Sequence, residues 1–161
     1  MRRSLTLSEI AALPAGLIAA VPVEGVRLIR RAHPLSWLSQ AVGRGPLIVV
    51  RGRRIFWPDL PADLSVRPEA LALLAHELTH VWQYAHGLTL WRYLWRERGR
   101  YRYRLTPGKT FTDYGYEQQA AMVEDWVRGL NGLSPRWGHP ADVQNLPLPD
   151  AFLISSSAVQ P

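Results

Sequence analysis

The segment His76-Glu77-Leu78-Thr79-His80 holds two histidines four positions apart, with a glutamate directly after the first. On an α-helix, residues four apart lie one turn along the same face, so both imidazoles can reach one metal ion. Glu77 would stand beside that ion rather than on it, because successive helical residues are rotated by about 100°. Its carboxylate could there accept a proton from water, which makes Glu77 a candidate general base.

A catalytic zinc ion needs a third protein ligand. The metzincin pattern is not matched, since Gln83 stands where that pattern has glycine. Glu117 fits instead, because it opens a later helix in which small residues, Ala120 and Ala121, permit a close approach. Glu124 lies two turns further on, as the rival ligand or as a hydrogen-bond partner of a ligand histidine.

Two alternatives to a metal site follow from the same residues. The histidines could be core residues satisfied by hydrogen bonds. A glutamate at the start of a helix could simply complement the helix dipole. Their position within the strongest helix pattern of the chain favours the metal site, with His76, His80 and Glu117 as ligands.

The expected chemistry is hydrolysis of a peptide bond by zinc-activated water, with Zn²⁺ as cofactor. A hydrogen-bond donor must share the oxyanion with the metal. Tyr114 is the predicted donor, because it lies three residues before Glu117 and so on its face of the helix. Tyr116 and His86 are alternatives.

Two helices must position these residues. The first is predicted over residues 69–86, with Pro68 in its first turn and Gly87 just past its end. Its apolar residues recur at three- and four-residue spacing, which predicts a buried stripe. The second helix is predicted to begin between Asp113 and Tyr116 and to run to about Arg128.

The amino-terminal part predicts further elements. A capped helix is expected over residues 8–19 and a strand over 26–30. Residues 47–50 and 53–57 flank Arg51-Gly52 and predict a hairpin. The strand over 53–57 is expected to form the sheet edge to which a peptide substrate adds.

Composition sets the outer limits. The 161 residues suit one domain, with 47% hydrophobic and 20% charged residues, and the absence of cysteine excludes thiolate ligands. We predict a domain over 1–133 and a proline- and serine-rich strap or disordered tail over 134–161. No membrane span is expected, and an interrupted apolar amino terminus favours a cytoplasmic location.

The net charge of +6 is concentrated in Arg92–Arg104, where six arginines alternate with aromatic residues. We interpret this segment as a solvated connector whose aromatics pack inward, which could favour an acidic substrate or partner. Nucleic-acid binding is disfavoured, because no recognised nucleic-acid fold accompanies the charge.

The motif HELTHVWQ, followed downstream by YGYEQQA, resembles Vgr-related metallopeptidase domains that occur beside bacterial secretion and contractile-injection genes. The resemblance covers roughly residues 5–130. It implies that His76, His80 and Glu117 ligate zinc and that Glu77 is the catalytic glutamate. Many such sites have an aspartate four residues after the ligand glutamate, where this chain has Ala121; Asp113, Gln118 and Glu124 could substitute.

The predicted fold is therefore α+β and minimally zincin-like, with a small twisted sheet on the HExxH helix and a second helix supplying Glu117. The predicted function is zinc-dependent peptide-bond hydrolysis. The alternatives are a non-catalytic, zinc-stapled adaptor of a secretion or injection system, and a nucleic-acid-binding module. Substrates of the related domains are unassigned.

Overall fold

The computed structural model describes residues 1–34, 47–89 and 100–154. The predicted α+β class is confirmed, since a small sheet and several helices occur together. In chain order the elements are β1 (Arg2–Arg3), α1 (Leu7–Ala12), α2 (Ala15–Ala20), η1 (Val23–Gly25), β2 (Arg27–Ile29), β3 (Val49–Arg51), β4 (Arg54–Phe56), α4 (Pro68–Ala85), η2 (Phe111–Asp113), α6 (Tyr116–Leu130), η3 (Pro140–Asn145) and α7 (Asp150–Leu153).

The sheet has the strand order β1-β2-β4-β3. The predicted hairpin is confirmed: β3 and β4 pair antiparallel, and Gly52 takes a positive φ of 60° in the turn, where a residue without Cβ is favoured. The prediction that residues 53–57 form the sheet edge is wrong. Strand β2 pairs in parallel with β4 on the side opposite β3, so β4 is an inner strand, and β1 and β3 are the outer strands of the described sheet.

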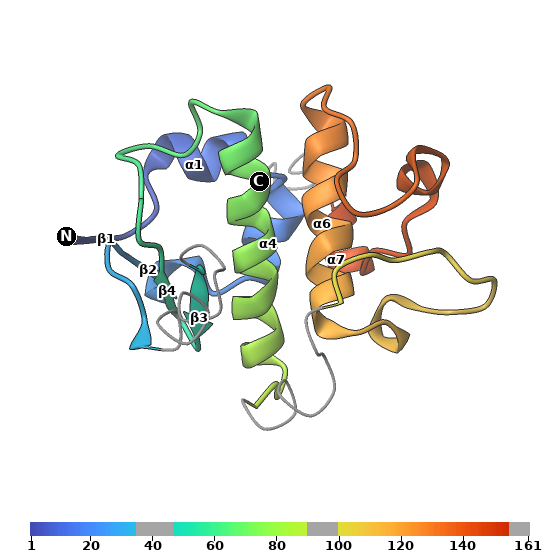
Figure 1. Ribbon diagram of the computed structural model, residues 1–161, viewed down its shortest axis with the longest axis horizontal. Helices are drawn as coiled ribbons and strands as arrows, with labels where there is room; N and C mark the ends of the chain where they lie inside the picture. The colour runs from blue at the N-terminus through green and yellow to red at the C-terminus, as the bar shows by residue number, and fades with distance from the viewer. Residues whose placement is uncertain (35–46, 90–99, 155–161) are drawn as a thin grey trace, which may run out of the picture.

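Helix α4 stands in the middle of the fold, between the sheet and α6 (Figure 1). Helices α4 and α6 lie side by side and run antiparallel, so the first turn of α6 faces the second half of α4. Helix α7 lies against α2, and the chain after α6 returns along the outer side of α6. The metal-site residues predicted from sequence therefore belong to the two central helices.

The sequence of α4 explains its length and its place. Pro68 occupies the first turn, where its missing N–H costs no hydrogen bond, and no glycine or proline interrupts the helix before Gly87. Its apolar stripe is almost completely buried, as the spacing predicts. The stripe contains Leu71, Leu74, Leu78 and Val81. The prediction that Ala85 is also buried is wrong, because Ala85 is the last residue of α4 and is exposed.

The amino-terminal helix predicted over residues 8–19 is wrong in one respect, because two short helices replace it. Helix α1 ends at Ala12, and Pro14 is the N-cap of α2. Proline lacks the N–H that a continuous helix needs, and it pushes the residue before it, Leu13, into an extended conformation.

The chain after α6 contributes to the core. Phe152 is 1% exposed and packs edge-to-face with Trp82 of α4 and with Phe111. Leu148 is also buried. Residues 134–154, which the sequence sets apart as a strap or tail, thus pack on the helices, and residues 155–161 lie outside the described residues. Within the described ranges, no helix is both long and apolar enough to span a bilayer.

A buried ion pair fastens the amino terminus to the segment that leads into α4. Both oxygens of Glu9 accept hydrogen bonds from Arg3 at 2.7 Å, and the backbone N–H groups of Thr6 and Leu64 also donate to Glu9. Burial alone would raise the pKa of Glu9, but these hydrogen bonds and the charge of Arg3 outweigh burial and lower the pKa.

We predict that Glu9→Gln lowers the free energy of unfolding at pH 7 by about 3 kcal/mol, because it leaves Arg3 without its buried partner. A carboxylate with a depressed folded pKa stabilises the fold above its unfolded pKa, and this contribution is lost as the pH falls through the folded pKa. The difference between the two proteins in urea unfolding should therefore shrink below about pH 4.5. Glu24→Gln, at an exposed position, is the control and should change stability by less than about 0.5 kcal/mol at either pH.

Candidate metal centre

His76 and His80 face α6 from adjacent turns of α4. Both side chains are nearly buried, at 4% and 8% exposure, and their ring centroids lie 5.0 Å apart. The helical spacing therefore brings the two imidazoles together as predicted. The leucine stripe of α4 fixes this helix against the core. Both rings are therefore positioned by a rigid element, which is more precise than a loop.

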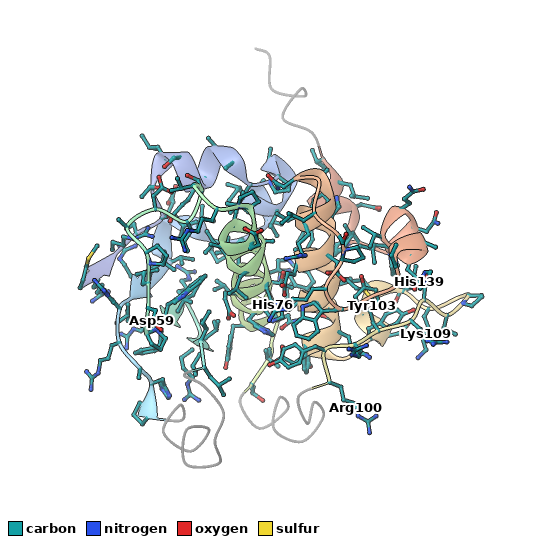
Figure 2. The ribbon with its side chains drawn as sticks, turned by 45° about the horizontal axis from the view of Figure 1, so that its top comes forward. Asp59, His76, Arg100, Tyr103, Lys109 and His139 are labelled. Carbon is teal, nitrogen blue, oxygen red and sulfur yellow. The ribbon has the colours of Figure 1, made fainter. Side chains whose placement is uncertain are left out.

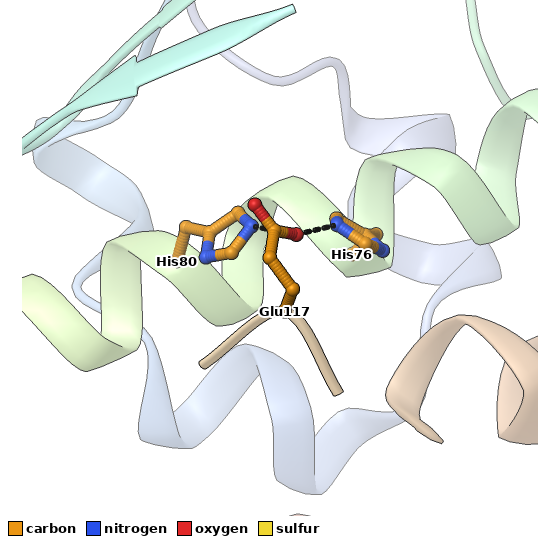
Figure 3. Close-up of side chains that lie close together, drawn as sticks. All are labelled: His76, His80 and Glu117. Carbon is orange, nitrogen blue, oxygen red and sulfur yellow. Dashed lines mark hydrogen bonds and ion pairs between the residues drawn. The ribbon is translucent and has the colours of Figure 1, made fainter. Parts of the chain in front are cut away.

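Glu117 completes the cluster from the first turn of α6 (Figure 3). Its Oε2 lies 3.2 Å from Nε2 of His76 and 3.3 Å from Nε2 of His80. The two helices approach closely because Ala120 and Ala121, both fully buried, add little bulk between them. One ligand atom from each of these three residues lies within 4.8 Å of the other two, so the buried group could hold a metal ion.

The outer nitrogens of both imidazoles are held by acceptors. Nδ1 of His76 lies 3.0 Å from Oε2 of Glu124, and Nδ1 of His80 lies 2.8 Å from Oε1 of Gln83. A carboxylate or amide oxygen only accepts, so each Nδ1 donates a proton and each Nε2 of a neutral ring keeps its lone pair. These lone pairs converge beside Glu117, as metal binding requires.

The amide orientation of Gln83 is fixed by two further acceptors. Its Nε2 donates to the carbonyl of Tyr116 at 3.0 Å and to Oε1 of Gln119 at 2.9 Å. Gln119 in turn donates to the carbonyl of Tyr114 at 2.8 Å. The side-chain oxygen of Gln83 must therefore face His80. Hydrogen bonds through the amides of Gln83 and Gln119 connect His80 to the start of α6.

The alternatives left open by the sequence are now separated. Glu124 contacts Nδ1 of His76, so it is the hydrogen-bond partner of a candidate ligand and does not belong to the group of three that could hold a metal ion. Asp113 instead caps η2 through Thr110, and Gln118 donates to the carbonyl of Arg102. Gln83 was not identified from sequence, although its position three residues after His80 places it on the same helical face.

The strap after α6 supports Glu124. The indole N–H of Trp137 donates to Oε2 of Glu124 at 2.7 Å, and Arg136 reaches the other oxygen at 3.3 Å. Oε2 of Glu124 thus joins Trp137 to His76. No spacing rule relates a residue in this proline-rich segment to a helix, so the contact of Trp137 with Glu124 could not be predicted from the sequence.

The Asp125 carboxylate accepts four hydrogen bonds, three of which come from this strap and hold it in place. The backbone N–H groups of Arg136, Trp137 and Gly138 all donate to it, and so does the hydroxyl of Tyr103. A buried carboxylate that accepts several N–H and O–H bonds is well satisfied. Asp125 and Glu124 are neighbours on α6, so the same turn anchors the strap and the support of His76.

The electrostatics of the cluster favour a cation. Burial works to lower the pKa of His76, but its hydrogen bonds to Glu117 and Glu124 outweigh burial and raise the pKa to about 10. Burial would raise the pKa of Glu117, but the adjacent imidazoles hold it far below its usual range. Ionised carboxylates thus surround the two rings, and positive charge is stabilised between them.

Glu77 lies beside the cluster and is 6% exposed. Burial raises the pKa of Glu77, while the imidazoles of His76 and His80 act against that rise. Among the residues described, none forms a hydrogen bond with its carboxylate. This carboxylate is therefore available to exchange a proton.

The residues predicted as oxyanion donors make other contacts in the structure. The hydroxyl of Tyr114, a buried residue, accepts a hydrogen bond from the backbone N–H of Thr106 at 2.9 Å. His86 is exposed, and its Nδ1 donates to the carbonyl of Trp82. Tyr116 contributes its backbone carbonyl to Gln83.

Tyr101 is the tyrosine that the structure brings to the cluster. Its ring centroid lies 5.9 Å from that of His76, and it stacks on Trp137 at 4.8 Å. Burial and the charges of Glu117 and Glu77 raise the pKa of Tyr101, so the hydroxyl keeps its proton. In the sequence, Tyr101 is one of several aromatics in an arginine-rich segment, and nothing singled it out.

We predict that Trp137→Phe lowers metal affinity about tenfold, because Glu124 loses the N–H that holds it against His76 while the aromatic ring is retained. Competition of the protein with a chromogenic chelator measures the affinity. Trp126→Phe is the matched control on α6, since no hydrogen bond of the Trp126 indole is found within the described ranges. Equal affinities for the wild type and Trp137→Phe would remove Trp137 from the support of the site.

Comparisons with known proteins place this geometry in a family context. No family model matches the chain. The type VI secretion system spike protein VgrG2b of Pseudomonas aeruginosa is 43% identical over 99 residues, which are 55% of this chain and 10% of that protein. The chain thus spans a small part of the length of VgrG2b.

The solved structure of the effector domain of Pseudomonas aeruginosa VgrG2b superposes with a TM-score of 0.62 at 27% sequence identity. The match covers 80% of this chain and 75% of the effector domain. The resemblance to Vgr-related domains expected from the HELTH and YGYEQQA motifs is confirmed to that extent. The chain is homologous to the VgrG2b effector domain.

Proposed function

We propose that this protein is a zinc-dependent hydrolase of peptide bonds, with a zincin-like arrangement of its sheet and two central helices. One observation carries the proposal: Nε2 of His76, Nε2 of His80 and Oε2 of Glu117 converge, and next to them lies the buried Glu77, whose carboxylate has no hydrogen-bond partner among the described residues. Each residue of this set is the type that metal-assisted hydrolysis needs.

The donor set fits zinc. Two imidazoles and one carboxylate are a common ligand set of catalytic zinc sites, and imidazole nitrogens disfavour Mg²⁺ and Ca²⁺. Ligand atoms bound at 2.0–2.1 Å to a tetrahedral zinc ion are about 3.3 Å apart. The contacts of Glu117 with His76 and His80, at 3.2 and 3.3 Å, match that spacing. When bound, zinc would supply Lewis acidity, which lowers the pKa of water and polarises a carbonyl.

Glu77 acts as the general base and then as the general acid. Its carboxylate accepts a proton from the attacking water and delivers it to the nitrogen of the departing amine. Its raised pKa suits both halves of this transfer, because the protonated and ionised forms are closer in free energy at neutral pH. Gln83 and Glu124 keep the two neutral imidazoles in the tautomer that carries its proton on Nδ1 and its lone pair on Nε2.

Tyr101 is the stronger candidate for the oxyanion donor. Its protonated hydroxyl belongs to a residue beside His76 and close enough to Glu77 and Glu117 to sense their charges. The hydroxyl of Tyr114, predicted from helical spacing, is directed instead toward Thr106, whose backbone N–H donates to it. A protonated phenol in a partly buried site stabilises developing negative charge more strongly than water would.

A peptide substrate would add to β3. This strand is one of the two outer strands of the described sheet, and it packs beside α4. An extended peptide that pairs with β3 would pass along the helix that carries Glu77. The substrate strand therefore shifts from residues 53–57 to the neighbouring strand of the same hairpin.

The homology favours a role in secretion. VgrG2b is a spike protein of a type VI secretion system, and the matching solved structure is its effector domain. We propose that this chain acts as an effector domain associated with such a system. The non-catalytic adaptor remains the second candidate, because the same homology supports it and a purely structural metal would use the same three ligands.

Glu77 separates the two candidates. We predict that Glu77→Gln reduces hydrolysis of a casein or peptide-library substrate at least about a thousandfold while zinc content stays near that of the wild type. Mass spectrometry of the digest and metal analysis of the same samples give both quantities. Glu69→Gln, an exposed change on the same helix, is the control and should keep full activity.

Retained hydrolysis in the Glu77→Gln protein would contradict the enzyme proposal. The absence of any cleavage by the zinc-loaded wild type, across an unbiased peptide library, would favour the adaptor. In the enzyme case, His80→Ala should lose both zinc and hydrolysis, because the metal loses a ligand.

Tyr101→Phe tests the oxyanion donor separately. We predict a fall in kcat of about a hundredfold with unchanged zinc affinity and little change in KM, since the hydroxyl acts on the developing charge. Tyr114→Phe is the matched comparison and should lower stability while it leaves kcat nearly unchanged, because the Tyr114 side chain is buried and its hydroxyl accepts a hydrogen bond from the backbone N–H of Thr106. The reverse pattern would restore Tyr114 as the donor.

A further inference from the structure

A cleft of about 780 Å³ opens between residues 102–105 and the strap, on the outer side of α6. Arg102, Arg104 and Leu105 line one wall, and Trp137, His139 and Asp142 belong to the other. In Figure 2 the side chains of Tyr103 and His139 lie close together on this side of α6. None of these residues belongs to the set of ligands described above.

The walls of the cleft are held rigidly by a single anchor. Asp125 binds the hydroxyl of Tyr103 from one wall and three backbone N–H groups of the strap from the other. Gly138 has no room for a Cβ, because the phenol ring of Tyr103 lies directly against it. The cleft is therefore a fixed feature of the fold rather than a gap between loosely packed segments.

Two arginines present their charge to this cleft from a fixed backbone. Burial alternates along the segment: Tyr103 is buried against α6, and Arg102 and Arg104 on either side of it are exposed. The carbonyl of Arg102 accepts a hydrogen bond from Gln118 of α6, which fixes the segment a second time. In the part of the chain that the structure describes, neither guanidinium has an ion-pair partner.

The cleft carries a net positive charge with few competing groups. Asp142 is the acidic residue in its lining, against two arginines and His139. Nδ1 of His139 accepts from the backbone N–H of Ala141, so a neutral His139 presents its other nitrogen as a donor. The lining thus holds more hydrogen-bond donors and positive charges than Asp142 can balance, and such a surface suits carboxylates.

The cleft adjoins the metal centre through Trp137. This residue lines the cleft, donates to Glu124 and stacks on Tyr101, whose ring lies next to His76. A chain that leaves the metal centre over Tyr101 would therefore reach Arg102 and Arg104 within a few residues. The geometry points to a recognition subsite for aspartate or glutamate side chains of a peptide substrate; this inference rests on the proposed function.

An acidic peptide fits the cleft better than a nucleic acid does. Bases bind single-stranded sites by stacking on exposed aromatic faces. Here Tyr101 stacks on Trp137, and the guanidinium of Arg136 lies 4.6 Å from the centroid of the Trp137 ring, so both residues occupy surface of that ring on which a base would stack. Tyr103 is buried, so its ring offers no exposed face for a base.

The arginines of Arg92–Arg104 predict an acidic substrate or partner for the whole of this segment. The structure narrows that expectation to Arg102 and Arg104, while residues 90–99 lie outside the described residues. The two arginines lie two positions apart along the chain and on the same side of it. Two acidic side chains at alternate positions of an extended peptide would match them.

Binding to the zinc-loaded Glu77→Gln protein tests the subsite without hydrolysis. Fluorescein-labelled decapeptide pools carry Asp and Glu at alternate positions, or Asn and Gln at the same positions, and a labelled ten-residue oligothymidylate is the third probe. We expect the acidic pool to bind at least about tenfold more tightly than the amide pool at low salt, with the preference reduced at 0.5 M NaCl.

Arg102→Gln/Arg104→Gln should abolish this preference and leave zinc content unchanged. Arg2→Gln/Arg67→Gln removes the same charge at two exposed positions elsewhere and should retain the preference. Equal binding of both pools, an equal loss in the control, or tighter binding of the oligonucleotide would overturn the subsite.

The two proposals fail in different ways. Cleavage by the wild type without any acidic preference in binding would overturn the subsite and leave the hydrolase standing. An acidic preference that depends on Arg102 and Arg104, in a protein that cleaves no peptide, would support the subsite and overturn the hydrolase.

Discussion

The rest of this fold depends on the contact of one carboxylate with two imidazoles. Glu117 contacts Nε2 of both His76 and His80, and this requires two helices to pack antiparallel at close range. Small side chains in α6 permit the approach, and the leucine stripe of α4 holds the helix from behind. The short sheet, the divided amino-terminal helix and the strap cover what remains of α4 and α6. A fold of this size thus devotes its two longest helices to positioning three polar groups.

Burying those polar groups costs free energy unless each has hydrogen-bond partners. The chain supplies partners for the imidazoles and further partners for those residues in turn. Gln83 and Glu124 hold the outer nitrogens of the rings, and Trp137 and Arg136 hold Glu124. Asp125, the next residue of α6, fixes the strap that delivers them. The region after residue 133 is therefore coupled to the centre through adjacent carboxylates on one helical turn. This coupling also places the arginine-lined cleft within reach of the centre.

Sequence alone predicted the parts of the site that follow from helix geometry. The four-residue spacing of His76 and His80 fixes a shared face, and Glu117 was identified because it opens a helix rich in small residues. Local chemistry likewise predicted the hairpin at Gly52 and nearly all of α4. Tyr101 and Trp137 could not be found in this way, because only tertiary packing brings an irregular segment and a distant strap to His76. The sheet edge was misplaced for the same reason: pairing of β2 with β4 is long-range, and no turn signal encodes it. Gln83 and Pro14 differ from these, because local signals do indicate their roles: Gln83 lies on the helical face of His80, and Pro14 lacks the N–H that a continuous helix needs.

The metal position itself is the most direct test of this account. Crystals of the protein grown with zinc can be measured at energies just above and just below the zinc absorption edge. The account predicts one strong anomalous peak, within about 2.0–2.2 Å of Nε2 of His76, Nε2 of His80 and a carboxylate oxygen of Glu117. A peak at other residues, or no ordered zinc while the two imidazoles keep their hydrogen bonds to Glu117, would contradict it.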